Sequence, residues 1–270
     1  MQKSNISVLL VTHDPFEAMF ISNQINIMNK TVLIVGFGAV GAFYGAKLDS
    51  YRIIALCRSN YGIVSRDGVT ILSEGNVTTF KPDLVVSSLN DINEPIDLIM
   101  IATKAIDNVS IAKLIAPVVG IKTSILICQN GRSGEIPFKA QFPNNHIAAL
   151  LPFIYVTQRK LGHIEHQAFG RVVIGPYGGV LSDTLLSLVK DLDTVIPVKC
   201  VTNIYKEQWK KLIWNVGFNP LSLRDGGLTT VEVCERYLRE LTAVMQEVQL
   251  LAQHDGYNIY DDFVKNTISE

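Results

Sequence analysis

The sequence is poor in charge and has no surplus of either sign. Its 270 residues include 24 Lys and Arg against 25 Asp and Glu, a formal net charge of −1 at pH 7, and charged residues are 18% of the total. Because nucleic-acid binding depends on a strongly basic surface, this balance gives a nucleic-acid partner no support. The sequence also lacks any apolar run near the roughly 20 residues that a bilayer span requires, so we expect no membrane partner.

Cysteine and histidine are scarce, and neither is spaced for a special site. His163 and His166 lie close together but have no further potential ligands nearby, so we expect no metal ion. The cysteines have no CxxC spacing, which is typical of free thiols in a reducing compartment, so we expect a cytoplasmic protein. These are Cys57, Cys128, Cys200 and Cys234.

The sequence does contain a glycine-rich motif between a strand and a helix. Residues 31–35 are rich in β-branched side chains and predict a buried strand, and residues 42–48 have helical spacing. In the motif between them, the first glycine permits a tight turn, the second lets the backbone approach a pyrophosphate, and the third allows close packing. The motif reads Gly36, Phe37, Gly38, Ala39, Val40, Gly41. A turn without a ligand is the alternative, but the context favours a dinucleotide at the helix N-terminus.

The end of the second predicted strand, 52–57, indicates which dinucleotide binds. In NAD-binding domains an acidic residue about 20 residues past the glycines binds the ribose 2′-hydroxyl. Here the segment Leu56-Cys57-Arg58-Ser59 contains no carboxylate, whereas the Arg58 guanidinium can pair with a 2′-phosphate. The alternative for Arg58 is an ordinary solvated charge, but the pattern favours NADP (NADPH).

Two polar side chains follow later buried strands, which are predicted at 97–102 and 122–128. Lys104 lies in a segment expected to open a helix at Thr103, where a cation is unfavourable for the helix dipole unless it binds an anion. Asn130 belongs to an Asn-Gly pair, which is also a common turn. Since ligands bind outside the carboxyl ends of strands in open α/β sheets, we expect both side chains near the cofactor.

The remaining pattern divides the chain into two parts. Up to about residue 201, short strand patterns alternate with helical ones, and after that only helical patterns follow. We therefore expect an α/β fold, with a Rossmann-type dinucleotide-binding domain at 31–202 and a helical domain at 203–270. The further strands are predicted at 68–72, 77–80, 84–86, 146–157, 162–166, 171–175 and 195–198, and the helices at 181–192, 209–219, 230–253 and 261–269.

A second polar motif lies on the first of the late helices. Lys211, Asn215 and Asn219 are spaced i, i+4, i+8 and therefore share one helix face. Asparagine is a poor helix former, so this arrangement favours the polar wall of a cleft over its alternative, a solvated stripe. Pro220 is expected to end or kink the helix.

Taken in order, these motifs resemble the ketopantoate reductase (2-dehydropantoate 2-reductase) family over about residues 29–270. The resemblance implies NADPH-dependent reduction of ketopantoate, a small-molecule substrate, to pantoate in pantothenate and coenzyme A biosynthesis. It rests on the glycine motif, Arg58, Lys104-Ala-Ile-Asp107, Gln129-Asn130-Gly131 and Trp209-x-Lys211-Leu-x-x-Asn215-x-x-x-Asn219-Pro220-Leu.

The resemblance also implies roles for single residues. Arg58 would contact the 2′-phosphate, and Lys104 would lie along the cofactor site. Asn130 would lie near the nicotinamide ribose and the catalytic lysine. Lys211 would be the general acid, with Asn130, Asn215 and Asn219 binding substrate. Asp107 departs from the glutamine that family members often carry.

The family continues beyond the equivalent of Ser269, through helices that bear a substrate-binding serine and a glutamate near the active site. We therefore expect a truncated helical domain, with a pocket short of one wall and exposed apolar surface that favours a homodimer or aggregation. Beside an active enzyme, two alternatives stay open: a catalytically inactive NADP-binding remnant, and a reductase of another small 2-keto acid.

Residues 1–30 fall outside this resemblance. Their segment Val8-Leu-Leu-Val-Thr-His13-Asp14-Pro-Phe-Glu17 resembles the switch-histidine region of ABC transporter ATPases. In that family the histidine reaches the γ-phosphate of ATP, a role that needs a GxxxxGK[ST] loop, which this sequence lacks. We expect residues 1–30 to be a fusion-like N-terminal extension without ATPase function.

Overall fold

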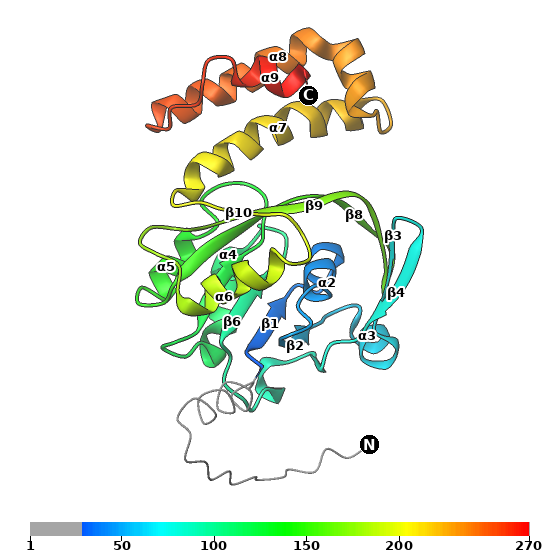
Figure 1. Cartoon of the computed structure of the whole chain (residues 1–270), viewed down its shortest axis with the longest axis vertical. Helices are drawn as coiled ribbons and strands as arrows, with labels where there is room; N and C mark the ends of the chain where they lie inside the picture. Colours follow the sequence, from blue (N-terminus) through cyan, green and yellow to red (C-terminus); the bar gives the residue numbers. More distant parts are fainter. Residues whose placement is uncertain (1–28, 270) are drawn as a thin grey trace, which may run out of the picture.

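The computed structural model describes residues 29–269 (Figure 1). The predicted N-terminal extension, including the segment around His13, lies outside the described residues apart from its last two positions. Within the described range, no helix combines the length and the apolar composition that a bilayer span requires.

Ten strands of residues 29–269 form one mixed sheet. They are β1 (Thr31–Val35), β2 (Arg52–Leu56), β3 (Val69–Ser73), β4 (Asn76–Phe80), β5 (Leu84–Val86), β6 (Leu98–Ile101), β7 (Ser124–Ile127), β8 (Ile147–Lys160), β9 (His163–Pro176) and β10 (Val198–Cys200). The order is β4-β3-β9-β8-β7-β6-β1-β2-β5, and β10 pairs with β9. From β5 through β8 all neighbours are parallel, which is the doubly wound order of a Rossmann domain.

The helices are α2 (Ala39–Gly45), α3 (Tyr61–Asp67), α4 (Asn108–Ile115), α5 (Ile136–Gln141), α6 (Asp183–Leu192), α7 (Ile204–Arg224), α8 (Thr230–His254) and α9 (Phe263–Ser269). Two 3₁₀ turns lie at Leu89–Asp91 and Ala116–Val118. Parallel strands need both faces covered, and the helices between them supply that cover.

The side chains of β1 show how the sheet divides the core. Val32 and Ile34 face one hydrophobic cluster, to which α2 and α6 contribute. Leu33 and Val35 face a second cluster, to which α4 and α5 contribute. Because successive strand residues point to opposite faces, an uninterrupted apolar strand is what a sheet with helices on both sides requires.

Strands β8 and β9 carry the sheet beyond its parallel part. They form a long antiparallel pair with register shifts, which curls over α2 and reaches β3 and β4 (Figure 1). The two strands predicted at 162–166 and 171–175 are therefore one strand. Phe169 (φ 65°) and Gly170 (φ 125°) adopt positive φ between them, so the chain bulges there and pairing resumes.

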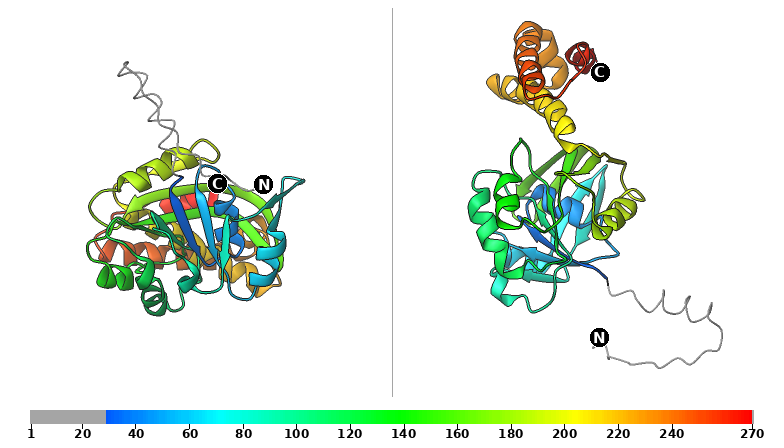
Figure 2. Two further views of the ribbon diagram at one scale, coloured as in Figure 1. Left: turned by 90° about the horizontal axis from the view of Figure 1, so that it is seen from below. Right: turned by 90° about the vertical axis from the view of Figure 1, so that its left-hand side faces the viewer.

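The last three helices have a hydrophobic cluster of their own, centred on side chains such as Ile213, Leu241 and Met245. They lie together at one end of the molecule, beyond the curled strands (Figure 2). Helix α8 begins with a capping box in which Thr229 and Glu232 bond each other's backbone. The domain division at 202 and 203 stays a prediction.

Three predicted helix boundaries are wrong. The helix expected to open at Thr103 begins at Asn108, because the Asp107 side chain accepts a hydrogen bond from the Ser110 N–H (2.9 Å) and caps the helix there. Helix α7 begins at Ile204 rather than at residue 209, because the Asn203 side chain caps it there, and it does not end at Pro220 but continues to Arg224. Proline removes one backbone donor, and packing of α7 against α8 offsets that loss.

Candidate active site

The glycine motif forms the turn between β1 and α2, and two of its glycines have no room for a side chain. A Cβ on Gly36, which has φ +95°, would lie 2.7 Å from the Thr103 nitrogen. A Cβ on Gly41 would lie 2.4 Å from the Gly36 carbonyl oxygen. Gly38 differs, because its nearest neighbour would be the Gln158 Oε1 at 3.9 Å. The backbone at Gly38 thus faces space that the protein does not fill.

The N-terminus of α2 is open beside that space. Gly38 is its N-cap residue, so no side chain bonds the first N–H groups, and the first turn holds no acidic residue. Unpaired N–H groups and the positive end of the helix dipole together attract phosphate. The residues present therefore fit a pyrophosphate.

Arg58 follows β2 in a loop that is tied to the glycine turn. Asn60 in the same loop donates a hydrogen bond from its amide nitrogen to the Phe37 carbonyl oxygen (2.7 Å). Arg58 itself is exposed, and it forms no ion pair with any carboxylate of residues 29–269. Its guanidinium is therefore free to bind an anion near the glycine turn.

The loops after β6 and β7 are joined by a side-chain network that sequence reasoning missed. The Gln129 amide nitrogen donates to the Thr103 hydroxyl (3.1 Å) and to Asn108 Oδ1 (2.9 Å), and Asn108 donates back to Gln129 Oε1 (2.9 Å). This network fixes the loop that carries Asn130, while Asn130 and Lys104 are exposed. The only sequence signal was polar residues directly after two strands.

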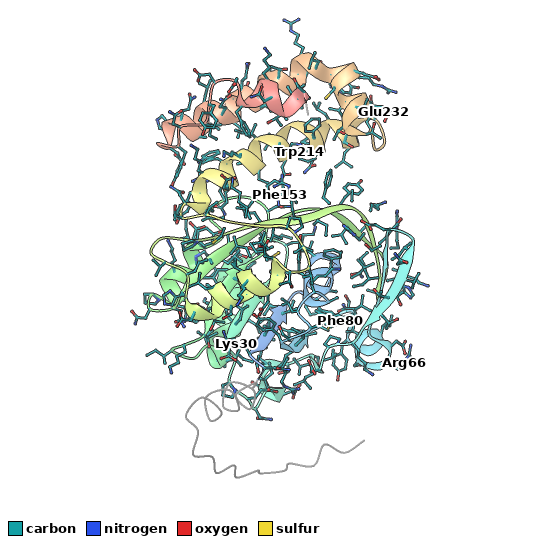
Figure 3. The ribbon with its side chains drawn as sticks, viewed as in Figure 1. Lys30, Arg66, Phe80, Phe153, Trp214 and Glu232 are labelled. Atoms are coloured by element: carbon teal, nitrogen blue, oxygen red, sulfur yellow. The ribbon has the colours of Figure 1, made fainter. Side chains whose placement is uncertain are left out.

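Lys211 projects from α7 toward the end of β7 and the neighbouring strand β8. Its ammonium donates a hydrogen bond to the Pro152 carbonyl oxygen and lies 5.2 Å from the centre of the Phe153 ring. Burial lowers the pKa of Lys211 to about 8; the nearby Cys128 thiol opposes this shift and the Arg171 guanidinium adds to it. Phe153 lies between the sheet and α7 (Figure 3). A lysine with this pKa exchanges protons readily near neutral pH.

Asn215 and Asn219 follow Lys211 along the same unbroken helix, so their i, i+4 spacing is preserved. Asn215 is half-buried and Asn219 is exposed. Neither side chain has a hydrogen-bond partner among residues 29–269, so both amides are available to a ligand. Their part in substrate binding stays a prediction.

Arg132 joins the loop after β7 to the helices. It forms an ion pair with Asp255 at the end of α8 (2.6 Å), and its guanidinium carbon lies 3.9 Å from the centre of the Trp209 ring. Trp209 and Lys211 are two residues apart on α7 and thus point to nearly opposite sides. Arg132 therefore holds α7 from the side opposite the Lys211 contact with β8.

Replacing Arg132 by methionine should lower the free energy of unfolding by about 1–2 kcal/mol, because a desolvated cation–π contact and an ion pair are lost together. Urea unfolding followed by tryptophan fluorescence measures this. Arg66→Met is the matched control and should leave stability unchanged, since within residues 29–269 the Arg66 side chain pairs only with its exposed neighbour Asp67. Equal effects from the two variants would contradict a role for Arg132 at this junction.

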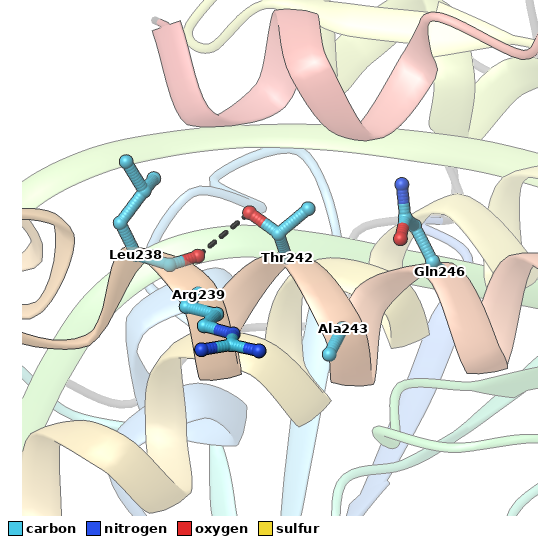
Figure 4. A pocket seen from close by; sticks show the side chains of 5 residues that line it. All are labelled: Leu238, Arg239, Thr242, Ala243 and Gln246. Atoms are coloured by element: carbon cyan, nitrogen blue, oxygen red, sulfur yellow. Dashed lines mark hydrogen bonds between the residues drawn. The ribbon is translucent and has the colours of Figure 1, made fainter.

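The depression on α8 shown in Figure 4 is not part of this site. It is lined by Leu238, Arg239, Thr242, Ala243 and Gln246. The Thr242 hydroxyl donates to the Leu238 carbonyl within the helix (2.7 Å), and the lining contains no group that transfers protons near neutral pH. Acid–base chemistry therefore points to Lys211 rather than to this surface.

Comparison with known proteins identifies relatives over nearly all of the described chain. The family model described as Ketopantoate reductase PanE/ApbA matches residues 32–179, and its C-terminal counterpart matches residues 203–270. A 2-dehydropantoate 2-reductase of Nostoc sp. is 29% identical over 246 residues, which are 87% of this chain and 76% of the relative.

Solved structures agree in fold. The crystal structure of 2-dehydropantoate 2-reductase from Methylococcus capsulatus matches with a TM-score of 0.80 and 32% identity, covering 88% of this chain and 78% of that one. A ternary structure of D-mandelate dehydrogenase with NADH and anilino(oxo)acetate matches with a TM-score of 0.77 at 18% identity, covering 88% of this chain and 78% of that one. The latter likeness concerns the fold alone.

Proposed function

The chain belongs to the ketopantoate reductase family, and from this premise we propose that it reduces 2-dehydropantoate (ketopantoate) to pantoate with NADPH. In the cell this would be a cytoplasmic step of pantothenate and coenzyme A biosynthesis. We extend the proposal to a homodimer that covers exposed apolar surface of α7–α9. The observation that carries the proposal is Lys211, a partly buried lysine with a pKa of about 8 beside the carboxyl end of β7.

The proposed cofactor site uses the turn after β1. Gly38 and the open N-terminus of α2 would hold the pyrophosphate, and Arg58 would pair with the 2′-phosphate. Lys104, after β6, would lie along the cofactor, and Asn130, after β7, would lie near the nicotinamide ribose. When bound, NADPH supplies the hydride for the keto carbon.

The protein would supply the proton and the orientation. Negative charge builds on the keto oxygen as its carbon is reduced, and the Lys211 ammonium would stabilise that charge and donate a proton to the oxygen. Asn215 and Asn219 would donate hydrogen bonds to the substrate without adding charge. The ketone thus gains one hydride and one proton, and Lys211 is reprotonated from solvent.

The direct test is NADPH oxidation by the purified chain with and without ketopantoate. Turnover well above the ketopantoate-free control supports the proposal. If the folded chain binds NADPH but turns over neither ketopantoate nor other small 2-keto acids, the inactive NADP-binding remnant is favoured instead. If the chain reduces a different 2-keto acid instead, the proposed substrate is wrong but the proposed type of reaction stands.

Cofactor selectivity has its own test at Arg58. Arg58→Ala should weaken NADPH binding about 10- to 100-fold, because charge-assisted hydrogen bonds to the 2′-phosphate are lost. NADH lacks that phosphate, so its affinity should stay the same. Titration of nicotinamide fluorescence measures both affinities. Equal losses for the two dinucleotides would show that Arg58 does not read the 2′-phosphate.

A further inference from the structure

Arg171 is a second cation beside Lys211 for which the proposed reaction has no role yet. It lies on β9 directly opposite Phe153 on β8. Its guanidinium carbon is 4.0 Å from the centre of the Phe153 ring, and the Lys211 ammonium is 5.2 Å from the same ring centre. One aromatic ring therefore contacts both cations.

No negative charge in the described part of the chain balances this pair. Neither the Arg171 guanidinium nor the Lys211 ammonium forms an ion pair with a carboxylate of residues 29–269. Besides Arg171, the titratable group near the Lys211 ammonium is the Cys128 thiol. Burial raises the pKa of Cys128 to about 12, so the thiol is neutral near pH 7. Two neighbouring cations repel each other, and a bound anion would remove that cost.

The Phe153 ring also orients Arg171. Stacking on an aromatic face leaves the edge of the planar guanidinium, with its N–H donors, free to bind. Arg171 is exposed, so a ligand can reach it from solvent. Planar, paired donors fit a carboxylate in two-point contact better than a single ammonium does.

We propose that Arg171 binds the carboxylate of the 2-keto acid substrate, beside the Lys211 that protonates the keto oxygen. In a 2-keto acid the carboxylate carbon is bonded directly to the keto carbon, so neighbouring cations can serve the two groups at once. This inference rests on the proposed function and adds to it the group that selects acids over neutral ketones. A solvated arginine resting on Phe153 is the competing explanation.

The first experiment compares ketopantoate with its lactone, which keeps the ketone but has no free carboxylate. Arg171→Met preserves length and packing on Phe153, and it should raise KM for ketopantoate about 10- to 100-fold while changing kcat far less. The lactone should be reduced equally well by both proteins, and Arg171→Lys should recover part of the loss. Arg159→Met, at a β8 arginine paired with Glu165, is the matched control and should change neither KM.

If Arg171 only stabilised the fold, its replacement would not change the pH dependence of kcat/KM. Because the Arg171 charge lowers the pKa of Lys211, Arg171→Met should shift the alkaline limb of kcat/KM to higher pH. An unshifted limb together with equal changes of KM for acid and lactone would overturn the proposal.

Calorimetric titration with oxalate separates this proposal from the reaction itself. Oxalate offers a carboxylate beside a second carbon–oxygen group and cannot be reduced here. Binding by the wild type that Arg171→Met abolishes would support the anion site even if ketopantoate is not turned over. Absence of wild-type binding, or equal binding by the variant, would overturn it.

Discussion

Lys211→Ala is expected to lower kcat by about 10²–10⁴ while leaving the affinity for NADPH within about twofold. The variant removes the only proton donor that we place at the keto oxygen, and it leaves the glycine turn and Arg58 intact. Steady-state NADPH oxidation gives kcat, and nicotinamide fluorescence gives the affinity.

Lys210→Ala is the control that the same helix offers. Lys210 pairs with Glu207 (3.0 Å), one turn back on α7, and has no contact with the Pro152 carbonyl. Its loss should leave kcat nearly unchanged. If Lys211→Ala turns over at the wild-type rate, or if both lysines matter equally, Lys211 is not the general acid.

The pH dependence of kcat/KM is a second test of Lys211 as the general acid. An acid must carry its proton to donate it, so kcat/KM should be flat below the pKa of about 8 and fall tenfold per pH unit above it. In Lys211→Ala this limb should be absent from the residual activity. A wild-type profile that stays flat through pH 9.5 would contradict the assignment.

Gly38→Ala should impair NADPH binding, whereas Gly41→Ala should impair the stability of the fold. At Gly38 a methyl group meets no atom closer than 3.9 Å, so the fold should tolerate it, within about 1 kcal/mol of wild-type stability. The methyl group would occupy the place of the pyrophosphate, and NADPH binding should fall at least about tenfold. At Gly41 the methyl group would collide with the Gly36 carbonyl at 2.4 Å, which should cost about 2–3 kcal/mol of stability without any cofactor.

Thermal unfolding with and without NADPH measures both effects. A ligand that binds only the folded state raises Tm, so the NADPH-dependent rise should vanish in Gly38→Ala. Gly62→Ala is the control, since a Cβ there has no atom within 4 Å and the residue lies in α3. A Gly38→Ala protein that keeps the full NADPH-dependent rise would rule out close approach of the pyrophosphate.

The parallel half of the fold could be predicted from sequence because its signals are local. The apolar run of β1, the three glycines and the small residues of α2 lie within fifteen residues of chain, and the structure confirms the strand and the turn. The same holds for β2, β6 and β7, which are short apolar runs bounded by turn residues.

The side-chain contacts that join separate elements could not be predicted, because the two residues of each contact lie far apart in sequence. Arg132 and Asp255 are 123 residues apart. The contact of Arg171 with Phe153 depends on a bulged register between β8 and β9, which no periodicity reveals. Helix α4 begins later than its pattern predicts, because the Asp107 cap outweighs the helical pattern before it.

The pairing of β3 with β9 implies a delay during synthesis on the ribosome, because β3 is made well before its partner strand. Four residues of β3 pair with residues that are translated 93 positions later, from Thr70 with His163 to Ser73 with His166. At about 5–20 residues per second, the β3–β4 hairpin would wait roughly 5–20 s before the β3 edge finds its partner strand. During that interval the hairpin presents open backbone donors and acceptors to other nascent chains, so chaperone demand should peak before residue 163 emerges.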